Sequence, residues 1–290
     1  MIISPKVILE DAKEQGYAVP AFSFYNLDIL FAVLEAAEEE NAPVIVQTYS
    51  DYYPFLHHEV IGRATLETIR QTKVAAALHM DHAADYDLLM RAINSGYTSV
   101  MIDGSALPLE VNIALTKAVV DVAKVVNVYT EAEVGRSGVD GVLSDDEYAD
   151  VDACVRLVNE TGVDSLAPAV GTADGGAKKV AEINMKRIQE IHDAVGIPLV
   201  LHGAYGIPDN RIRQAIDCGV YKIIVGVELK YAWSEAMKDG LLKGEKEPRI
   251  LSAYARDKVR EAARKKLRLF GATGKNPQIL KSQYEEEYYE

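Results

Sequence analysis

Cysteine is scarce in this chain of 290 residues, which contains only Cys154 and Cys218. Two cysteines exclude a framework of disulfide bonds, and a reducing compartment is the simplest setting for them. No apolar run approaches the roughly 20 residues that a membrane-spanning helix needs. The first residues also lack the basic flank and the long apolar stretch of a signal peptide. We therefore expect a cytoplasmic protein that does not enter a membrane.

Basic residues are outnumbered by acidic ones. The sequence has 31 Lys and Arg against 44 Asp and Glu, which gives a net charge of −13. A nucleic-acid-binding surface needs clustered basic residues, and so does docking on anionic lipid. We expect neither nucleic acid nor a membrane as a partner.

Apolar runs of strand length alternate with amphipathic helical segments along most of the chain. Some runs are continuous, such as Pro43–Val46, which is typical of strands buried on both faces. Eight such units predict parallel strands closed into a single (β/α)8 TIM barrel, for which about 250 residues is typical. A doubly wound open sheet is the alternative, but no linker divides the chain near its middle. The predicted strands are Ala18–Phe22, Pro43–Thr48, Val74–His79, Ser99–Asp103, Asn127–Glu133, Ser165–Val170, Pro198–His202 and Tyr221–Val225.

The end of the chain differs from the repeating part. Arg249–Phe270 reads as a long, strongly charged amphipathic helix, which extends the barrel by a C-terminal helical segment. We assign residues 1–278 to the barrel domain. Residues 279–290 form an acidic tail that is either partly disordered or packed on a partner subunit.

Polar residues cluster where the predicted strands end. The third strand ends in His79-Met80-Asp81-His82, the fifth in Glu131-Ala132-Glu133, and the seventh in His202-Gly203. In a TIM barrel these strand ends meet at one rim, where active sites are built. Histidines and carboxylates from separate strands are what a catalytic divalent metal needs, with an open position for substrate. Bonding to loop backbones would explain any one of them, but the set on one rim favours a site.

Several of these motifs together resemble a known family. The segments Ala77–His82, Thr98–Ser105, Glu131–Gly135 and Val200–Ala204, in this order, are similar to the metal-dependent class II fructose-bisphosphate and tagatose-bisphosphate aldolases. The resemblance runs from about Val7 to Lys275.

The resemblance implies a mechanism and a set of roles. Zinc acts as a Lewis acid on a ketose and stabilises the enediolate formed when a carbon–carbon bond breaks. His82 and His202 are implied as zinc ligands, and Glu133 as a carboxylate close to the metal. Asp81 is implied as the acid/base at the C4 hydroxyl. Strand alternation adds His79, which lies two residues before Asp81 on the same face and is expected to orient it. The family also implies a small carbohydrate substrate and a homodimer or homotetramer.

The chain departs from the family pattern at two loop positions. The third ligand is a histidine in a Gly-Thr-Ala-His-Gly motif, which here reads Gly171–Gly175 with Asp174 in its place. Two histidines and a carboxylate still form a familiar metal set, and manganese, iron or cobalt become candidates beside zinc. Loss of the metal is the alternative. The glutamate of the family's flexible loop is also missing, and only Asp140 remains as a stand-in catalytic group.

The expected phosphate-binding residues have changed as well. A serine has become Tyr205, and a run of polar donors has become Ile224–Val227. Ser23 and Tyr49 stand where asparagine and serine are usual. We predict that Ser23, Gly175, Gly203 and Tyr205 contact substrate in an altered pocket, which favours a less polar terminal group than phosphate. Lys178 and Lys179 are the alternative, because they would suit a carboxylate or a phosphate bound differently.

The leading hypothesis is a divergent class II aldolase acting on a ketose or ketose phosphate. Two alternatives stay open at this point. A metal-dependent sugar isomerase or epimerase would use the same enediolate without bond cleavage. A carbohydrate-binding barrel with a decayed site would explain the altered ligand and the missing glutamate.

Overall fold

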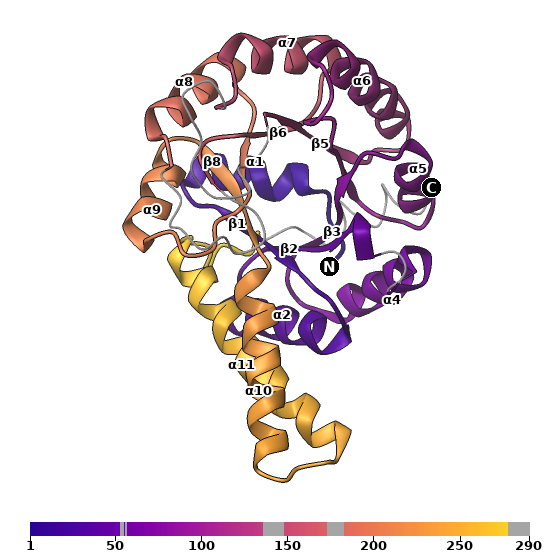
Figure 1. The fold of residues 1–290 in the computed structure, drawn as a ribbon, viewed down its shortest axis with the longest axis vertical. Helices are drawn as coiled ribbons and strands as arrows, with labels where there is room; N and C mark the ends of the chain where they lie inside the picture. Colours follow the sequence, from indigo (N-terminus) through magenta and orange to yellow (C-terminus); the bar gives the residue numbers. More distant parts are fainter. Residues whose placement is uncertain (53–54, 56, 136–147, 173–182, 278–290) are drawn as a thin grey trace.

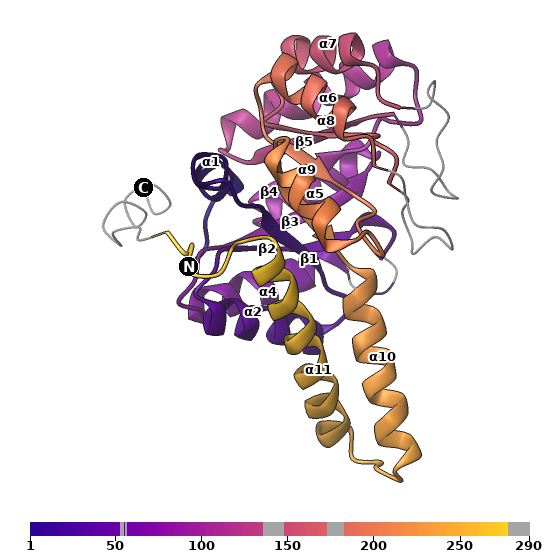
Figure 2. The same ribbon diagram turned by 90° about the vertical axis from the view of Figure 1, so that its left-hand side faces the viewer.

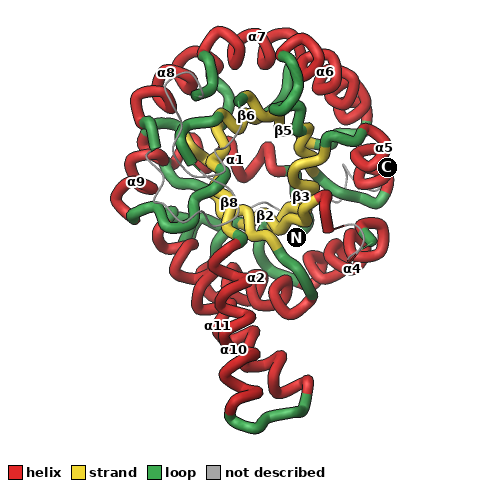
Figure 3. The backbone as a smooth tube through the Cα atoms, viewed as in Figure 1, coloured by secondary structure: helices red, strands yellow, loops and turns green. Residues whose placement is uncertain are grey.

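The computed structural model of the protein describes residues 1–52, 55, 57–135, 148–172 and 183–277. Within them, parallel strands β1 to β8 pair in sequence order and close into a barrel ringed by helices (Figure 1; Figure 3). This confirms the predicted TIM barrel. The strands are β1 (Val19–Ser23), β2 (Val44–Tyr49), β3 (Ala76–Ala83), β4 (Ser99–Ile102), β5 (Tyr129–Val134), β6 (Ser165–Pro168), β7 (Leu199–Leu201) and β8 (Val220–Val225).

The helices follow the strands as the amphipathic pattern predicts. Several begin at a side chain that accepts a backbone N–H, such as Asn26 before α2, Asp85 before α5 and Asp150 before α7. The helices are α1 (Pro5–Gln15), α2 (Leu27–Glu40), α4 (His58–Gln71), α5 (Tyr86–Asn94), α6 (Leu109–Val125), α7 (Val151–Thr161), α8 (Met185–Val195), α9 (Asp209–Asp217), α10 (Val227–Leu242) and α11 (Pro248–Leu269), with a short 3-10 turn η1 (Ser50–Tyr52). No helix of the described residues has the length and apolar character of a membrane span.

The main core lies between the barrel wall and the helices. It contains Val100 and Ile102 of β4, while Met101 between them belongs to a separate small cluster with Ala167 and Val200. Because side chains alternate along a strand, Met101 points into the barrel. Met101, Ala167 and Val200 therefore form an apolar layer inside the barrel, and polar groups occupy other buried positions of the interior.

Helices α10 and α11 form a pair that projects from the barrel (Figure 1; Figure 2). Helix α11 contacts both α10 and α2, and it confirms the long C-terminal helix expected from the sequence. Its buried residues Val259 and Leu267 pack into the main core. Arg264 and Arg268 both form salt bridges with Glu40 at the end of α2. The oligomeric state stays a prediction, and the acidic tail 279–290 lies outside the described residues.

Candidate active site

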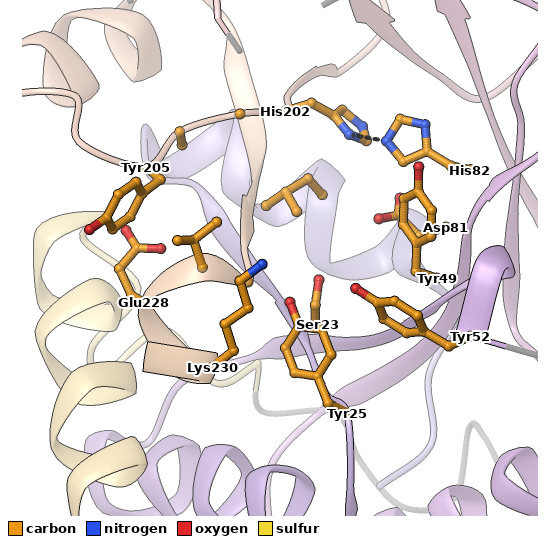
Figure 4. Close-up of a pocket in the computed structure, with 15 residues that line it drawn as sticks. Ser23, Tyr25, Tyr49, Tyr52, Asp81, His82, His202, Tyr205, Glu228 and Lys230 are labelled. Carbon is orange, nitrogen blue, oxygen red and sulfur yellow. Dashed lines mark hydrogen bonds between the residues drawn. The ribbon is translucent and has the colours of Figure 1, made fainter. Parts of the chain in front are cut away.

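A cavity of about 340 Å³ opens at the C-terminal ends of the strands. Its lining includes Ser23, Asp81, His82, His202, Gly203 and Tyr205 (Figure 4). The structure thus gathers on one rim six of the residues that the sequence marks as a site.

Two histidines face each other across the rim. Nε2 of His82 lies 2.8 Å from Nδ1 of His202. The outer nitrogens contact carboxylates: Nδ1 of His82 lies 2.9 Å from Asp103, and Nε2 of His202 lies 3.1 Å from Glu131. Since an ionised carboxylate only accepts hydrogen bonds, each outer nitrogen carries a hydrogen. In the neutral rings two lone pairs then point at each other, so a proton or a cation must lie between them.

Asp81 places a carboxylate beside the two histidines. Its Oδ2 accepts a hydrogen bond of 2.6 Å from Gln47, whereas its Oδ1 is buried with no hydrogen-bond partner among the described residues. Ligand atoms of Asp81, His82 and His202 all lie within 4.8 Å of one another. A buried carboxylate oxygen next to two imidazole lone pairs fits a divalent cation well.

The surroundings of His82 are strongly negative. Burial opposes its charged form, but Asp81, Asp103 and Glu133 outweigh burial and raise the pKa of His82 to about 10. Oε2 of Glu133 lies 3.5 Å from Nδ1 of His82, on the side of the ring that faces away from His202. Such an excess of negative charge favours any cation at this rim, whether a proton or a metal.

The backbone of β3 explains how neighbouring residues reach the same rim. Adjacent side chains on a regular strand point to opposite faces. Here the register with β4 breaks between Met80 and Ala83, and His82 has a φ of 46° in the left-handed region. Asp81 and His82 can therefore both line the cavity. This irregular segment belongs to β3, so the strand continues four residues beyond its predicted end at His79.

A row of aromatic rings connects the histidines to the far end of the cavity. Tyr49 lies 5.1 Å from the His82 ring and 5.5 Å from Tyr52, and Tyr52 lies 5.2 Å from Tyr25, all between ring centres. Tyr205 stands across the cavity, at the side of Glu228 (Figure 4). Tyr25 and Tyr52 are lining residues that the motifs did not mark.

Two lysines that the sequence motifs did not mark lie in or behind the lining of the cavity. Lys222 of β8 is buried and contacts Glu131 at 2.7 Å. Lys230 of α10 points its ammonium into the cavity (Figure 4). A lysine inside the apolar strand Val220–Val225 is the one signal that would have revealed Lys222. Asp140, Asp174 and Gly175 lie outside the described residues, so their roles stay predictions.

Comparisons with known proteins agree with this geometry. Residues 3–275 match the family described as fructose-bisphosphate aldolase class-II. The chain is 40% identical to a 6-phospho-5-dehydro-2-deoxy-D-gluconate aldolase of Halalkalibacterium halodurans, over 94% of this chain and 98% of that one. It is 38% identical to a fructose-bisphosphate aldolase of Staphylococcus aureus, over 94% and 99% of the two chains.

A solved structure shares the fold along the whole length. The YdjI aldolase from Escherichia coli K12 superimposes with a TM-score of 0.88 at 32% identity, covering 96% of this chain and 100% of that one. The chain therefore belongs to the class II fructose-bisphosphate aldolase family. Its members are metal-dependent lyases of carbon–carbon bonds, and the cluster of Asp81, His82 and His202 is a possible metal-binding site of this chain.

Proposed function

We propose that this protein is a metal-dependent aldolase that cleaves and forms a carbon–carbon bond in a ketose phosphate. His82 and His202 hold the metal, Asp174 is the third ligand, and Glu133 is an acidic neighbour of the centre. Zinc is the first candidate, with manganese, iron and cobalt beside it. The observation that carries the proposal is the pair of facing histidine nitrogens next to the buried Oδ1 of Asp81.

Bound metal would supply Lewis-acid polarisation of the ketose oxygens. Among the residues of the chain, Asp81 is the one that takes up and returns the proton. Gln47 holds one carboxylate oxygen of Asp81 and also donates to Ser23, so the other oxygen keeps a fixed orientation. That oxygen accepts the proton of the C4 hydroxyl as C4 becomes a carbonyl, and the electron pair of the C3–C4 bond moves to the ketone side. We assign Asp140 to the proton transfer on that side, in place of the missing loop glutamate.

The far end of the cavity supports an anionic group on the substrate. The hydroxyl groups of Tyr25 and Ser23 lie beside Gly226, the residue that precedes α10. A Cβ atom placed on Gly226 would lie 2.9 Å from the Tyr25 hydroxyl and 3.2 Å from Oγ of Ser23. The motif comparison favours a less polar group here, because Tyr205 and Ile224–Val227 replace polar donors. Lys230 changes that interpretation, since its ammonium supplies a cation that the motifs did not reveal.

Among the described residues, the salt bridges around the cavity do not include Lys230, so its ammonium can bind an anionic group of the substrate. Glu228 forms a salt bridge of 2.6 Å with Lys266, whereas Lys230 has no salt bridge in the described part of the chain and its Nζ lies 5.9 Å from the ring centre of Tyr231. Two relatives have names that specify phosphorylated sugars as substrates. We therefore assign the phosphate to Lys230, Tyr25 and Ser23, with Gly203, Tyr205 and Gly175 as further substrate contacts.

Turnover of defined ketoses tests the proposal. The protein, loaded with zinc or manganese, is incubated with fructose 1,6-bisphosphate, tagatose 1,6-bisphosphate, fructose 1-phosphate and free fructose. Exchange of dihydroxyacetone phosphate hydrogens with deuterated water is followed in parallel, because this half-reaction needs no matching aldehyde. We expect exchange and cleavage of a phosphorylated ketose. Isomerisation or epimerisation without fragments would replace the proposal, and bound metal with neither exchange nor cleavage would refute it.

A further inference from the structure

Lys222 is a buried cation that the proposed chemistry does not use. It lies on β8 with 1% of its surface exposed, and it does not line the cavity. Its Nζ contacts two groups, Oε2 of Glu131 at 2.7 Å and Nε2 of His79 at 3.1 Å. A lysine is almost never buried so deeply unless it is paired, so these two contacts account for its presence inside the barrel.

The contact with His79 decides which nitrogen of that ring carries hydrogen. An ammonium group only donates hydrogen bonds, so Nε2 of His79 must accept. The hydrogen of the neutral ring is then on Nδ1, from which it is donated to Oγ of Ser99 at 2.7 Å. A second hydrogen on Nε2 would point at the ammonium, so the contacts with Lys222 and Ser99 hold the ring in this neutral form.

This tautomer matters because His79 also faces Asp81. Nε2 of His79 lies 3.8 Å from Oδ1 of Asp81, the oxygen that has no hydrogen-bond partner among the described residues. A hydrogen on Nε2 would let His79 donate to this oxygen and occupy it. With Lys222 in place, the lone pair of Nε2 accepts from the ammonium, so Nε2 has no hydrogen to donate and Oδ1 stays available for the substrate hydroxyl.

The second contact of Lys222 is with Glu131, which is the residue that orients His202. Lys222 holds Oε2 of Glu131, and Oε1 accepts the hydrogen on Nε2 of His202 at 3.1 Å. Nδ1 of His202 then keeps its lone pair toward His82. A carboxylate that orients a histidine in this way is a common partner of metal-binding imidazoles.

We infer that Lys222 is a positioning residue that sets the tautomer of His79, while Glu131, whose other carboxylate oxygen Lys222 holds, sets the tautomer of His202. The ammonium thus prepares the surroundings of the acid/base Asp81 and does not line the cavity. The benefit to catalysis rests on the proposed role of Asp81, but the tautomers themselves can be measured in the metal-free protein without any reaction.

Nitrogen NMR of histidine-labelled, metal-free protein reads the tautomers directly. The wild type should show hydrogen on Nδ1 of His79 and on Nε2 of His202, with the two signals assigned by their loss in His79→Gln and His202→Gln. Lys222→Met alone leaves Glu131 buried without its cation, which can prevent folding. The informative variant is therefore Lys222→Met/Glu131→Gln, in which both partners are neutral and the glutamine oxygen still accepts from His202.

In this double variant His79 should shift its hydrogen to Nε2, whereas His202 should keep its tautomer. We expect kcat to fall by roughly 10- to 100-fold with little change in KM, as is typical when an outer partner of such a centre is lost. Lys238→Met, on the exposed part of α10, is the matched control and should change neither property.

Two results would overturn the inference: hydrogen on Nε2 of His79 in the wild type, or an unchanged His79 tautomer in the double variant. The expected tautomers in a protein without aldolase activity would instead refute the proposed function and leave the role of Lys222 intact.

Discussion

Nε2 of His82 and Nδ1 of His202 lie 2.8 Å apart, and the outer nitrogen of each ring already donates to a carboxylate. Two neutral rings held in this way present lone pairs to each other, which is unfavourable without a positive charge between them. Asp103 and Glu131 therefore prepare the pair for a cation as much as the histidines themselves do. The arrangement predicts that metal binding stabilises the folded protein.

Adding zinc or manganese to the metal-free protein should raise its melting temperature. At a metal concentration 100 times the Kd, binding stabilises the folded state by about 2.7 kcal/mol, and this corresponds to roughly 5 °C in a chain of this size. The shift should vanish in His202→Ala and persist in His192→Ala, whose histidine lies on α8 away from the rim. An equal shift in both variants, measured by calorimetry, would place the metal elsewhere.

Sequence patterns predict the barrel and part of its rim for a physical reason. Continuous apolar runs identify β1 to β8, and strand ends identify Asp81 and His202, because both are properties of short segments. The other contacts of the site join residues that are far apart in the sequence. Lys222 and Glu131 are separated by 91 positions, and no local pattern reports such a contact.

Strand β5 shows what the alternation of side chains along a strand cannot predict. Glu131 and Glu133 are two residues apart, so they share a face, and the motif singles out Glu133 as the carboxylate near the metal. Only the spatial arrangement shows that Glu131 contacts His202, while Glu133 lies beside His82. The left-handed turn at His82 is equally hard to predict from sequence, since positive φ is uncommon for any residue other than glycine, even though histidine is enriched there.

Asp81→Asn should remove catalysis and spare the metal. Asparagine keeps the shape and the contact with Gln47 but cannot take up a proton, so kcat should fall by about 10²- to 10⁴-fold. Metal content should stay that of the wild type. Asp87→Asn, an exposed position at the start of α5, serves as the control and should be fully active. A loss of metal in Asp81→Asn as large as in His202→Ala would make Asp81 a ligand rather than the base.

Lys230→Met should weaken the binding of phosphorylated substrates selectively. A hydrogen bond to a charged group contributes about 1.5–3 kcal/mol, so KM for a ketose phosphate should rise by roughly 10- to 100-fold. The rate with an unphosphorylated ketose should stay within about twofold. Lys238→Met, also on α10 but exposed, tests for a general charge effect. Steady-state kinetics with both substrates would contradict the assignment if Lys230→Met and Lys238→Met behaved alike.

Glu40→Gln should lower stability at neutral pH and have a smaller effect in acid. Glu40 is 5% exposed, and hydrogen bonds from Arg268, Arg264 and Thr273 outweigh burial and lower its pKa from 4.5 to about 2. A carboxyl with a lowered pKa stabilises the folded state above its ordinary pKa, and this contribution is lost as the pH falls from 4.5 toward 2. Because the two arginines are partly exposed, solvent screens the attraction, and we expect an effect of about 1 kcal/mol.

Urea unfolding at neutral pH and near pH 3 measures this difference. The gap in unfolding free energy between wild type and Glu40→Gln should shrink in acid, where the unfolded carboxyl is protonated and the folded one begins to take up its proton. Glu10→Gln, exposed on α1, is the control and should match the wild type at both values. Since Arg264 and Arg268 belong to α11, a gap that stayed constant with pH would mean that packing, and not charge, attaches the projecting helix pair to α2.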